Sequence, residues 1–238
     1  MFAIFFGIIS LLYASVGQAG GTAFLALMAI AAFPPSEMRP TALALNIVAA
    51  AYSTWAFNRA RSIDWSKLRP LLFPSLPTAL IGGFIVLDEQ AYKTTTGVVL
   101  LLAGAVMVIR RHGSDVLETE IPRWGAVLVG AIVGLVSGLT GVGGGVFLAP
   151  LLIVLRWASP RQTAGLSPPF ILANSMAGLV GVLFAGQRPS TQFGLYAVAT
   201  LVGAVIGSAI GLRLLGETAT RFVLAAILLA AGVQLIAF

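Results

Sequence analysis

The sequence predicts an all-α polytopic membrane protein made of two inverted repeats, each a re-entrant broken-helix hairpin plus three transmembrane helices. Three observations predict this fold: the composition, a glycine break in each half of the chain, and the distribution of the basic residues. Of the 238 residues, 58% are hydrophobic and only 9% are charged, as in chains that lie in lipid. The apolar runs show no period-two alternation, so they indicate helices and not barrel strands.

The first apolar stretch covers residues 1–33 and is too long for one span. A straight helix of that length would extend about 50 Å, whereas the hydrocarbon core is about 30 Å thick. Glycine is a poor helix former, and the run Gly17-Gln18-Ala19-Gly20-Gly21 divides the stretch into Met1–Val16 and Thr22–Phe33. Each piece is short for a full span, which favours a hairpin that returns to its starting side.

The second half of the chain repeats this pattern. Trp124–Thr140 precedes the run Gly141-Val142-Gly143-Gly144-Gly145, and Val146–Trp157 follows it. Three further helices are expected after each hairpin. They cover about Thr41–Asn58, Pro70–Leu87, Thr94–Ile109, Pro160–Ala185, Thr191–Leu214 and Thr218–Phe238.

Residue matches support a duplication within a single membrane domain, 1–238. The first repeat covers 1–110, the second 124–238, and 111–123 form a linker expected in the cytoplasm. The hairpin glycines match at an offset of 124 residues, and other matches lie at 128, which a four-residue insertion around Pro168-Pro169 would reconcile. The matches at 128 are Asn46 with Asn174, Lys93 with Arg221, and Gly104 with Gly232.

The basic residues decide between two topologies. If each broken segment crossed the membrane once, the 14 basic residues would divide eight against six, which is no bias. If each is a hairpin, eleven share one side, and only Arg39, Lys93 and Arg188 lie opposite. The positive-inside rule then places the eleven in the cytoplasm of a bacterial inner membrane, with both termini outside. Each repeat crosses an odd number of times, so the second is inverted relative to the first.

The hairpin tips are the predicted binding site. If they enter from opposite faces, they meet near the midplane, where the second arm of each hairpin begins and leaves N–H groups unpaired. Two such helix N-termini would bind an anion without a charged side chain. The candidate residues are Gln18, Gly20, Gly21, Thr22, Asn46, Thr140, Gly143, Gly144, Gly145, Asn174 and Ser175.

Other uses of the same residues stay open. The first arms bring carbonyl groups to the tips, and carbonyls suit a cation. The glycines could also serve only to let the tips pack closely. Asn46 and Asn174 could line the site, or they could tie helices together through interhelical hydrogen bonds.

The composition also excludes several classes. The chain has no cysteine, its one histidine is His112 in the central loop, and its acidic residues lie in or beside predicted loops. No intramembrane proton relay, metal site or catalytic group is therefore expected, so the protein is not expected to be an enzyme and needs no cofactor. The net charge is +6, but the basic residues lie in short loops between the predicted spans, where membrane orientation explains them, so the charge does not indicate a nucleic-acid partner. The expected partners are a small anionic substrate and the lipid bilayer.

Two glycine stripes with a four-residue spacing are expected to be helix-packing faces, with a homodimer interface as the alternative. They are Gly130, Gly134 and Gly138, and Gly203, Gly207 and Gly211.

The stretch Gly138-Leu-Thr-Gly-Val-Gly-Gly-Gly-Val-Phe-Leu-Ala-Pro-Leu-Leu (to Leu152) resembles the signature of the TauE/SafE sulfite exporter family. The first half echoes it with Ser15-Val-Gly-Gln-Ala-Gly-Gly-Thr-Ala-Phe-Leu (to Leu25), in which Gln18-Ala19 replaces part of the glycine run. The resemblance implies transport of sulfite, organosulfonates or related small anions.

The function expected from these observations is a secondary transporter or facilitator for a small anion. The first alternative is a cation channel or carrier that uses the tip carbonyls. The second alternative is a membrane assembly subunit that transports nothing, which would have a dry and closed interior.

Overall fold

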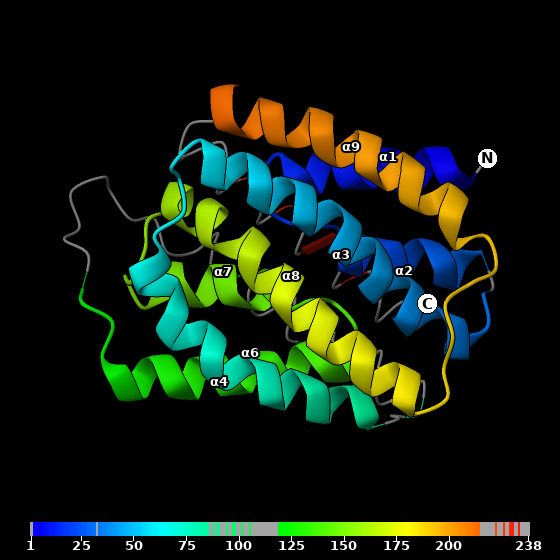
Figure 1. Cartoon of the computed structure of the whole chain (residues 1–238), viewed down its shortest axis with the longest axis horizontal. Helices are drawn as coiled ribbons and strands as arrows, with labels where there is room; N and C mark the ends of the chain where they lie inside the picture. Colours follow the sequence, from blue (N-terminus) through cyan, green and yellow to red (C-terminus); the bar gives the residue numbers. More distant parts are fainter. Residues whose placement is uncertain are drawn as a thin grey trace.

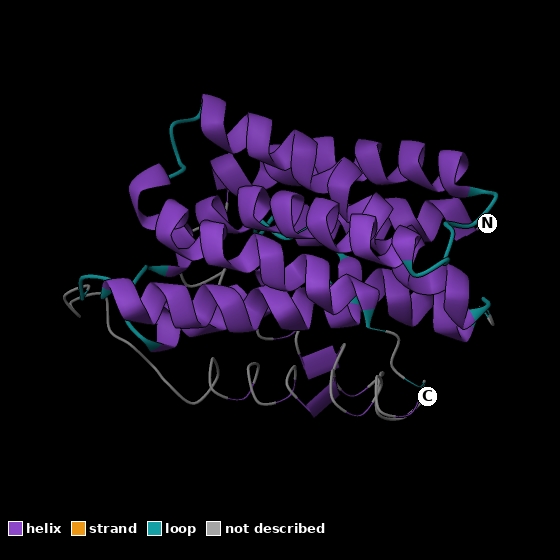
Figure 2. Cartoon of the chain, turned by 60° about the horizontal axis from the view of Figure 1, so that its bottom comes forward, coloured by secondary structure: helices purple, strands orange, loops and turns teal. Residues whose placement is uncertain are grey.

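A computed structural model describes residues 2–31, 33–85 and 119–214, together with isolated positions between 88 and 105 and between 222 and 233. Within this part the regular structure is helical, as predicted, and the described residues contain no strand (Figure 2). The helices are α1 (Phe2–Ala14), α2 (Gly21–Ile30), α3 (Pro35–Arg59), α4 (Trp65–Phe84), α6 (Arg123–Thr140), α7 (Gly145–Val154), α8 (Pro160–Phe184) and α9 (Phe193–Leu214).

Three described helices, α6, α8 and most of α9, are long and apolar enough to cross a membrane. The helices α1, α2 and α7 are apolar but only 10–13 residues long, as expected for the arms of broken segments. The predicted helices Thr94–Ile109 and Thr218–Phe238, and nearly all of the linker 111–123, lie outside the described residues.

Both predicted breaks are present. Residues 15–20 separate α1 from α2, and residues 141–144 separate α6 from α7. In Figure 1, α1 starts at the right edge and α2 returns to the right, whereas α6 starts at the left edge and α7 returns to the left. The two tips therefore reach the interior from opposite ends of the molecule.

Two helices begin five or six residues before their predicted starts at Thr41 and Pro70, because Pro40 and Pro70 lie inside the helices and do not mark their beginnings. α3 starts at Pro35, where the missing N–H of proline is harmless, and it accommodates Pro40 inside the helix. α4 starts at Trp65, since the Asp64 carboxylate accepts hydrogen bonds from Ser66 N and Lys67 N and so caps the helix.

The helix bounds correct the register between the two halves. α2 and α7 have 10 residues each and correspond at the offset of 124, while α3 and α8 have 25 residues each and correspond at 125. α8 therefore contains no four-residue insertion relative to α3. In this register Asn46 corresponds to Ile171, and Asn174 corresponds to Ala49. The helix bounds therefore do not pair Asn46 with Asn174.

Glycines bring helix backbones into direct contact in two places, which we call the α4–α6 seam and the α1–α9 seam. Along each seam a glycine from one helix faces a backbone carbonyl of the other, with no room for a side chain. In the α4–α6 seam, Gly130, Gly134 and Gly138 face Leu71, Ser75 and Ala79. In the α1–α9 seam, Gly203, Gly207 and Gly211 face Gly7, Leu11 and Ser15. Both predicted glycine stripes are thus packing faces within the chain.

The helix α3 lies between the helices of the two seams. It packs against α8 and α9, and Ser53 Oγ lies 2.9 Å from Ser208 Oγ on α9. The main apolar core lies around both hairpins and includes Phe6, Phe24, Leu148 and Phe170, all fully buried.

Candidate functional site

The two hairpin tips are built on glycines in a left-handed backbone conformation. Gly20 (φ 109°) and Gly144 (φ 80°) immediately precede α2 and α7, and Gly141 (φ 76°) ends α6. L-residues with a side chain rarely adopt such φ values. Glycine also offers no side chain to cap the following helix, so the first amide groups of α2 and α7 are free of side-chain caps. Residues 16–22 and 140–150 are all buried.

The tips are in contact with each other. Gln18 Nε2 on the first tip donates to the Gly145 carbonyl on the second at 3.4 Å. A methyl group on Gly21 would lie only 2.5 Å from the Val142 carbonyl oxygen, and equally close to Asn46 Nδ2. The predicted convergence of the glycine-rich segments is therefore present in the described structure.

The Asn46 side chain anchors the second tip. Its Nδ2 donates to the carbonyl oxygens of Val142 at 3.1 Å and Gly141 at 3.5 Å. Asn174 behaves differently, because its Nδ2 donates to the Phe170 carbonyl of its own helix at 2.9 Å. The two amides, predicted as a symmetric pair, have distinct roles.

The predicted hydroxyl residues sit close to the tips, and two of them are used locally. Thr22 Oγ1 lies 2.8 Å from Tyr13 Oη, a contact between the two arms of the first hairpin. Thr140 Oγ1 donates to the Val136 carbonyl at 2.7 Å, one turn back in α6. Ser175 Oγ borders the second tip, since a methyl group on Gly143 would lie 2.8 Å from it.

Buried polar atoms without partners gather around the second tip. Ten buried side-chain nitrogen and oxygen atoms in the described part of the chain have no hydrogen-bond partner, and five of them belong to Ser137 and to four of the predicted site residues. A methyl group on Gly145 would lie 2.8 Å from one of them, Gln18 Oε1, and one on Gly144 would lie 3.3 Å from another, Ser137 Oγ. Leaving a buried polar group unpaired costs about 1–3 kcal/mol, so these atoms are candidates for binding a polar ligand. The five atoms are Gln18 Oε1, Asn46 Oδ1, Asn174 Oδ1, Ser137 Oγ and Ser175 Oγ.

Sequence reasoning missed Ser137. It lies four residues before the glycine that ends α6, so it faces the tip from the last turn of that helix. The four-residue spacing from Gly141 would have placed Ser137 at the tip from the sequence alone.

Arg39 is a second residue that sequence reasoning missed. Charge counting placed it among the outer loop residues, whereas it is a buried member of α3 with 7% of its surface exposed. Its guanidinium donates to the carbonyls of Gly138 on α6 at 2.8 Å and of Ile85 beyond α4 at 3.0 Å. A cation is favoured at helix C-termini, where carbonyls are unpaired.

The position of Arg39 matters for the site. Its Cγ would lie 3.4 Å from a methyl group on Gly141, so the side chain passes directly beside the second tip. The guanidinium itself donates to the carbonyl of Gly138, three residues before Gly141, so a formal positive charge lies close to the second tip. Reading the start of α3 at Pro35 would have placed Arg39 inside the helix.

The described acidic residues are all at least partly exposed, unlike the tips. None of them is buried, and no group of three or more His, Cys, Asp or Glu side chains in the described part could hold a metal ion. The chemistry that this arrangement offers is hydrogen bonding to a small ligand, with one buried guanidinium nearby.

The whole chain resembles known membrane transporters. A model of the family described as sulfite exporter TauE/SafE matches residues 1–235. The probable membrane transporter protein y4hK of Sinorhizobium fredii is 34% identical over 238 residues, covering 98% of this chain and 96% of that protein. The probable membrane transporter protein YjnA of Bacillus subtilis is 26% identical over 239 residues, covering 91% and 92%. No solved structure gives a significant match.

Proposed function

Because this chain belongs to the TauE/SafE sulfite exporter family, which is a family of membrane transporters and not of enzymes, we propose that it moves a small anion across the bacterial inner membrane. The proposed cargo is sulfite, an organosulfonate or a related oxyanion. The proposed site is the contact between the two hairpin tips.

One observation carries this proposal: two helices without side-chain caps begin at buried tips that touch each other. The N-termini of α2 and α7 follow Gly20 and Gly144, and both helices direct their partial positive ends at the tips. Ser137 Oγ and Ser175 Oγ add two unpartnered hydroxyl donors. The Arg39 guanidinium adds a long-range attraction for a negative charge without contacting the tip as an ion pair.

The topology is part of the proposal. Hairpins that enter from opposite ends, as in Figure 1, are what two repeats inverted in the membrane plane would produce. Since most basic residues fall on one side of this arrangement, the proposed topology has the α3–α4 and α7–α8 connections in the cytoplasm and the α8–α9 connection outside.

The driving force follows from what surrounds the site. No described carboxylate or imidazole is buried near the tips, so we propose that no side chain there carries a coupling proton. An anion that leaves an inside-negative cell gains about 2.3 kcal/mol per charge per 100 mV, which suffices for export as a uniport.

A cation channel or carrier is the second candidate, and a specific observation favours it. The amide groups of Gln18, Asn46 and Asn174 all donate to backbone carbonyls, which leaves their three oxygens unpartnered. Oxygen ligands of this kind suit a sodium ion. The third candidate, an assembly subunit without transport, predicts no flux of any ion.

Flux in proteoliposomes separates the three candidates. We expect an electrogenic flux of sulfite or ethanesulfonate at clamped potential, and we expect Gly144→Val to abolish it. The matched control is Gly194→Val, because Gly194 has open space around its Cβ position and an ordinary φ. Sodium flux without anion flux would support the second candidate. Proteoliposomes that pass neither sodium nor the anion would support the third.

A further inference from the structure

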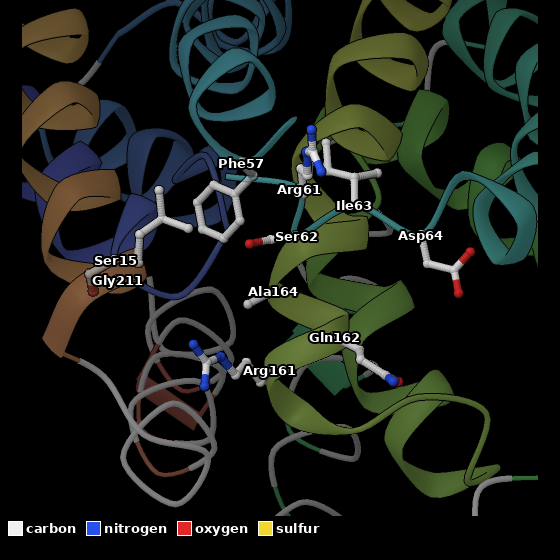
Figure 3. A pocket seen from close by; sticks show the side chains of 11 residues that line it. Ser15, Phe57, Arg61, Ser62, Ile63, Asp64, Arg161, Gln162, Ala164 and Gly211 are labelled. Carbon is white, nitrogen blue, oxygen red and sulfur yellow. The ribbon is translucent and has the colours of Figure 1, made fainter. Parts of the chain in front are cut away.

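A cavity of about 340 Å³ opens at the end of the molecule where α3 ends and α8 begins (Figure 3). It lies between four segments: the end of α1, the connection from α3 to α4, the start of α8 and the end of α9. Ser15, Ser62, Arg61, Arg161, Ala164 and Gly211 are among its lining residues. Its volume is in the range of small-molecule sites.

Close backbone contacts fix the walls of this cavity. Gly165 on α8 packs against the Ser62 carbonyl, and Gly211 on α9 packs against the Ser15 carbonyl, with no space for a side chain at either glycine. Gly17 of the first hairpin packs in the same way against the Ala164 carbonyl. The walls are therefore held by direct backbone contacts, and the wall at Ala164 touches the first hairpin tip.

One positive charge, that of Arg161, extends into the cavity, whereas the Arg61 guanidinium points away from Ser62 and Arg161 (Figure 3). Arg161 extends toward Ser15 and Gly211, and Arg61 lies at the edge beside Ser62 (Figure 3). The Asp64 carboxylate points away from these residues in the same view. It is occupied at the start of α4, where it accepts hydrogen bonds from Ser66 N, Ser66 Oγ and Lys67 N.

The backbone at Arg61 is held in a conformation that favours glycine. Its φ is 54°, and the amides of Arg61 and Ser62 donate to the carbonyls of Asn58 and Phe57, which closes the end of α3. An L-residue in this conformation costs about 1–2 kcal/mol. Strain of this kind often marks functional positions. Arg156 has the same conformation (φ 60°) at the end of α7 but does not line the cavity, so it is a matched control.

We propose that this cavity is a second anion site, at the cytoplasmic entrance of the transport route, in which Arg161 and the Ser62 hydroxyl bind a sulfonate-type or sulfite-type oxyanion before it reaches the first hairpin tip, while Arg61 adds positive charge at the edge of the cavity. The proposal rests on the proposed function, since it assumes an anionic cargo. Guanidinium and hydroxyl groups are standard donors to oxyanions. The headgroup of an anionic lipid presents the same chemistry, so the experiment must separate the two sources.

Charged thiol reagents test the site without measuring transport. The chain has no cysteine, so Ser62→Cys introduces a single thiol into the cavity. The control is Ala60→Cys, an exposed position two residues away that is not part of the lining. Both variants, in nanodiscs of zwitterionic lipid, are treated with methanethiosulfonate reagents that carry either a sulfonate or a trimethylammonium group.

We expect the ratio of the sulfonate rate to the trimethylammonium rate to be at least about fivefold higher at Ser62→Cys than at Ala60→Cys, because the positive charges that line the cavity attract the sulfonate. Unreactive ethanesulfonate should slow modification of Ser62→Cys only. Adding Arg161→Gln should remove the preference and adding Arg61→Gln should reduce it, whereas adding Arg156→Gln, the control for Arg61→Gln, should retain it. Equal preference at positions 60 and 62, no protection by ethanesulfonate, or equal effects of Arg161→Gln and Arg156→Gln would overturn the proposal.

Nanodiscs that contain phosphatidylglycerol separate a lipid headgroup from a free anion. Persistence of ethanesulfonate protection in this lipid supports the free-anion site. If phosphatidylglycerol alone abolishes the preference and ethanesulfonate protects no further, the cavity holds lipid and the proposal fails. A failure of the proposed function is a different result, because it appears as absent anion flux whatever the thiol chemistry shows.

Discussion

Replacing Asn46 by alanine should disturb the protein far more than the same change at Asn174. Asn46 Nδ2 connects α3 to the second hairpin tip through the Val142 carbonyl at 3.1 Å. Asn174 Nδ2 donates to Phe170, four residues earlier in its own helix. The two side chains are chemically identical and both are fully buried, so the comparison isolates the partner.

The magnitude follows from what each change leaves behind. Asn46→Ala leaves the buried Val142 carbonyl without that donor, which costs about 1–3 kcal/mol. Asn174→Ala leaves the Phe170 carbonyl in the hydrogen-bond ladder of α8, and both substitutions remove an amide oxygen that has no partner among the described residues. The cost of Asn174→Ala should be about 0–1 kcal/mol, since alanine is also the better helix former. The difference of about 2 kcal/mol corresponds to well over tenfold in the unfolding equilibrium.

Thermal unfolding in detergent measures the difference, and calorimetric titration with ethanesulfonate measures its effect on the tips. For a chain of this size, each kcal/mol lowers Tm by about 2–4 °C. We expect Asn46→Ala to unfold several degrees below the parent protein and to bind the anion at least tenfold more weakly. Asn174→Ala should stay within about 3 °C of the parent and retain binding. Equal losses in the two variants would refute the role assigned to Asn46.

Three further results are expected. Arg39→Lys should lower the free energy of unfolding by about 1.5–3 kcal/mol, because one ammonium group cannot replace a fork that spans two helices, while Arg188→Lys on the exposed surface should be neutral. An impermeant maleimide should reach Ser62→Cys from the cytoplasm and Thr191→Cys from outside, and labelling of both from one face would contradict the proposed topology. Hydrogen bonds from Ser66 lower the pKa of the Asp64 carboxyl, so its stabilisation of α4 is present above about pH 4 and is lost as pH falls through the lowered value. Unfolding midpoints of Asp64→Asn should therefore depend less on pH in acid than those of the parent, and identical profiles would argue against the cap.

The helices and their breaks were predictable because they depend on strong local signals. A stretch of 33 apolar residues cannot form one span, and glycine runs end helices wherever they occur. The early starts of α3 and α4 were missed for an equally local reason. Proline is tolerated in the first turn and inside packed membrane helices, so Pro40 and Pro70 did not mark boundaries.

The composition of the site was less predictable. Matching residues by identity paired Asn46 with Asn174, whereas equivalence between the halves depends on which residue faces which tip. In the register set by the helix bounds, Asn46 meets Gly21, and its counterpart Ile171 meets Gly145. The burial of Arg39 was invisible for a related reason, because charge counting assigns a basic residue to a loop and cannot detect carbonyls brought to it by α4 and α6.

The two glycine seams also constrain how the molecule can move. Helices separated by side chains can slide over one another as rotamers change. Where two backbones are in direct contact, no side chain lies between them to adjust in this way. The α4–α6 seam joins α4 to the first arm of the second hairpin, and the α1–α9 seam joins α9 to the first arm of the other. Each tip is thus attached to a rigid helix pair, α4 with α6 or α1 with α9. The helix α3 packs against α9, where the Ser53 and Ser208 hydroxyl groups are in contact. Rotation of one helix pair relative to the other would separate the tips while leaving both seams intact.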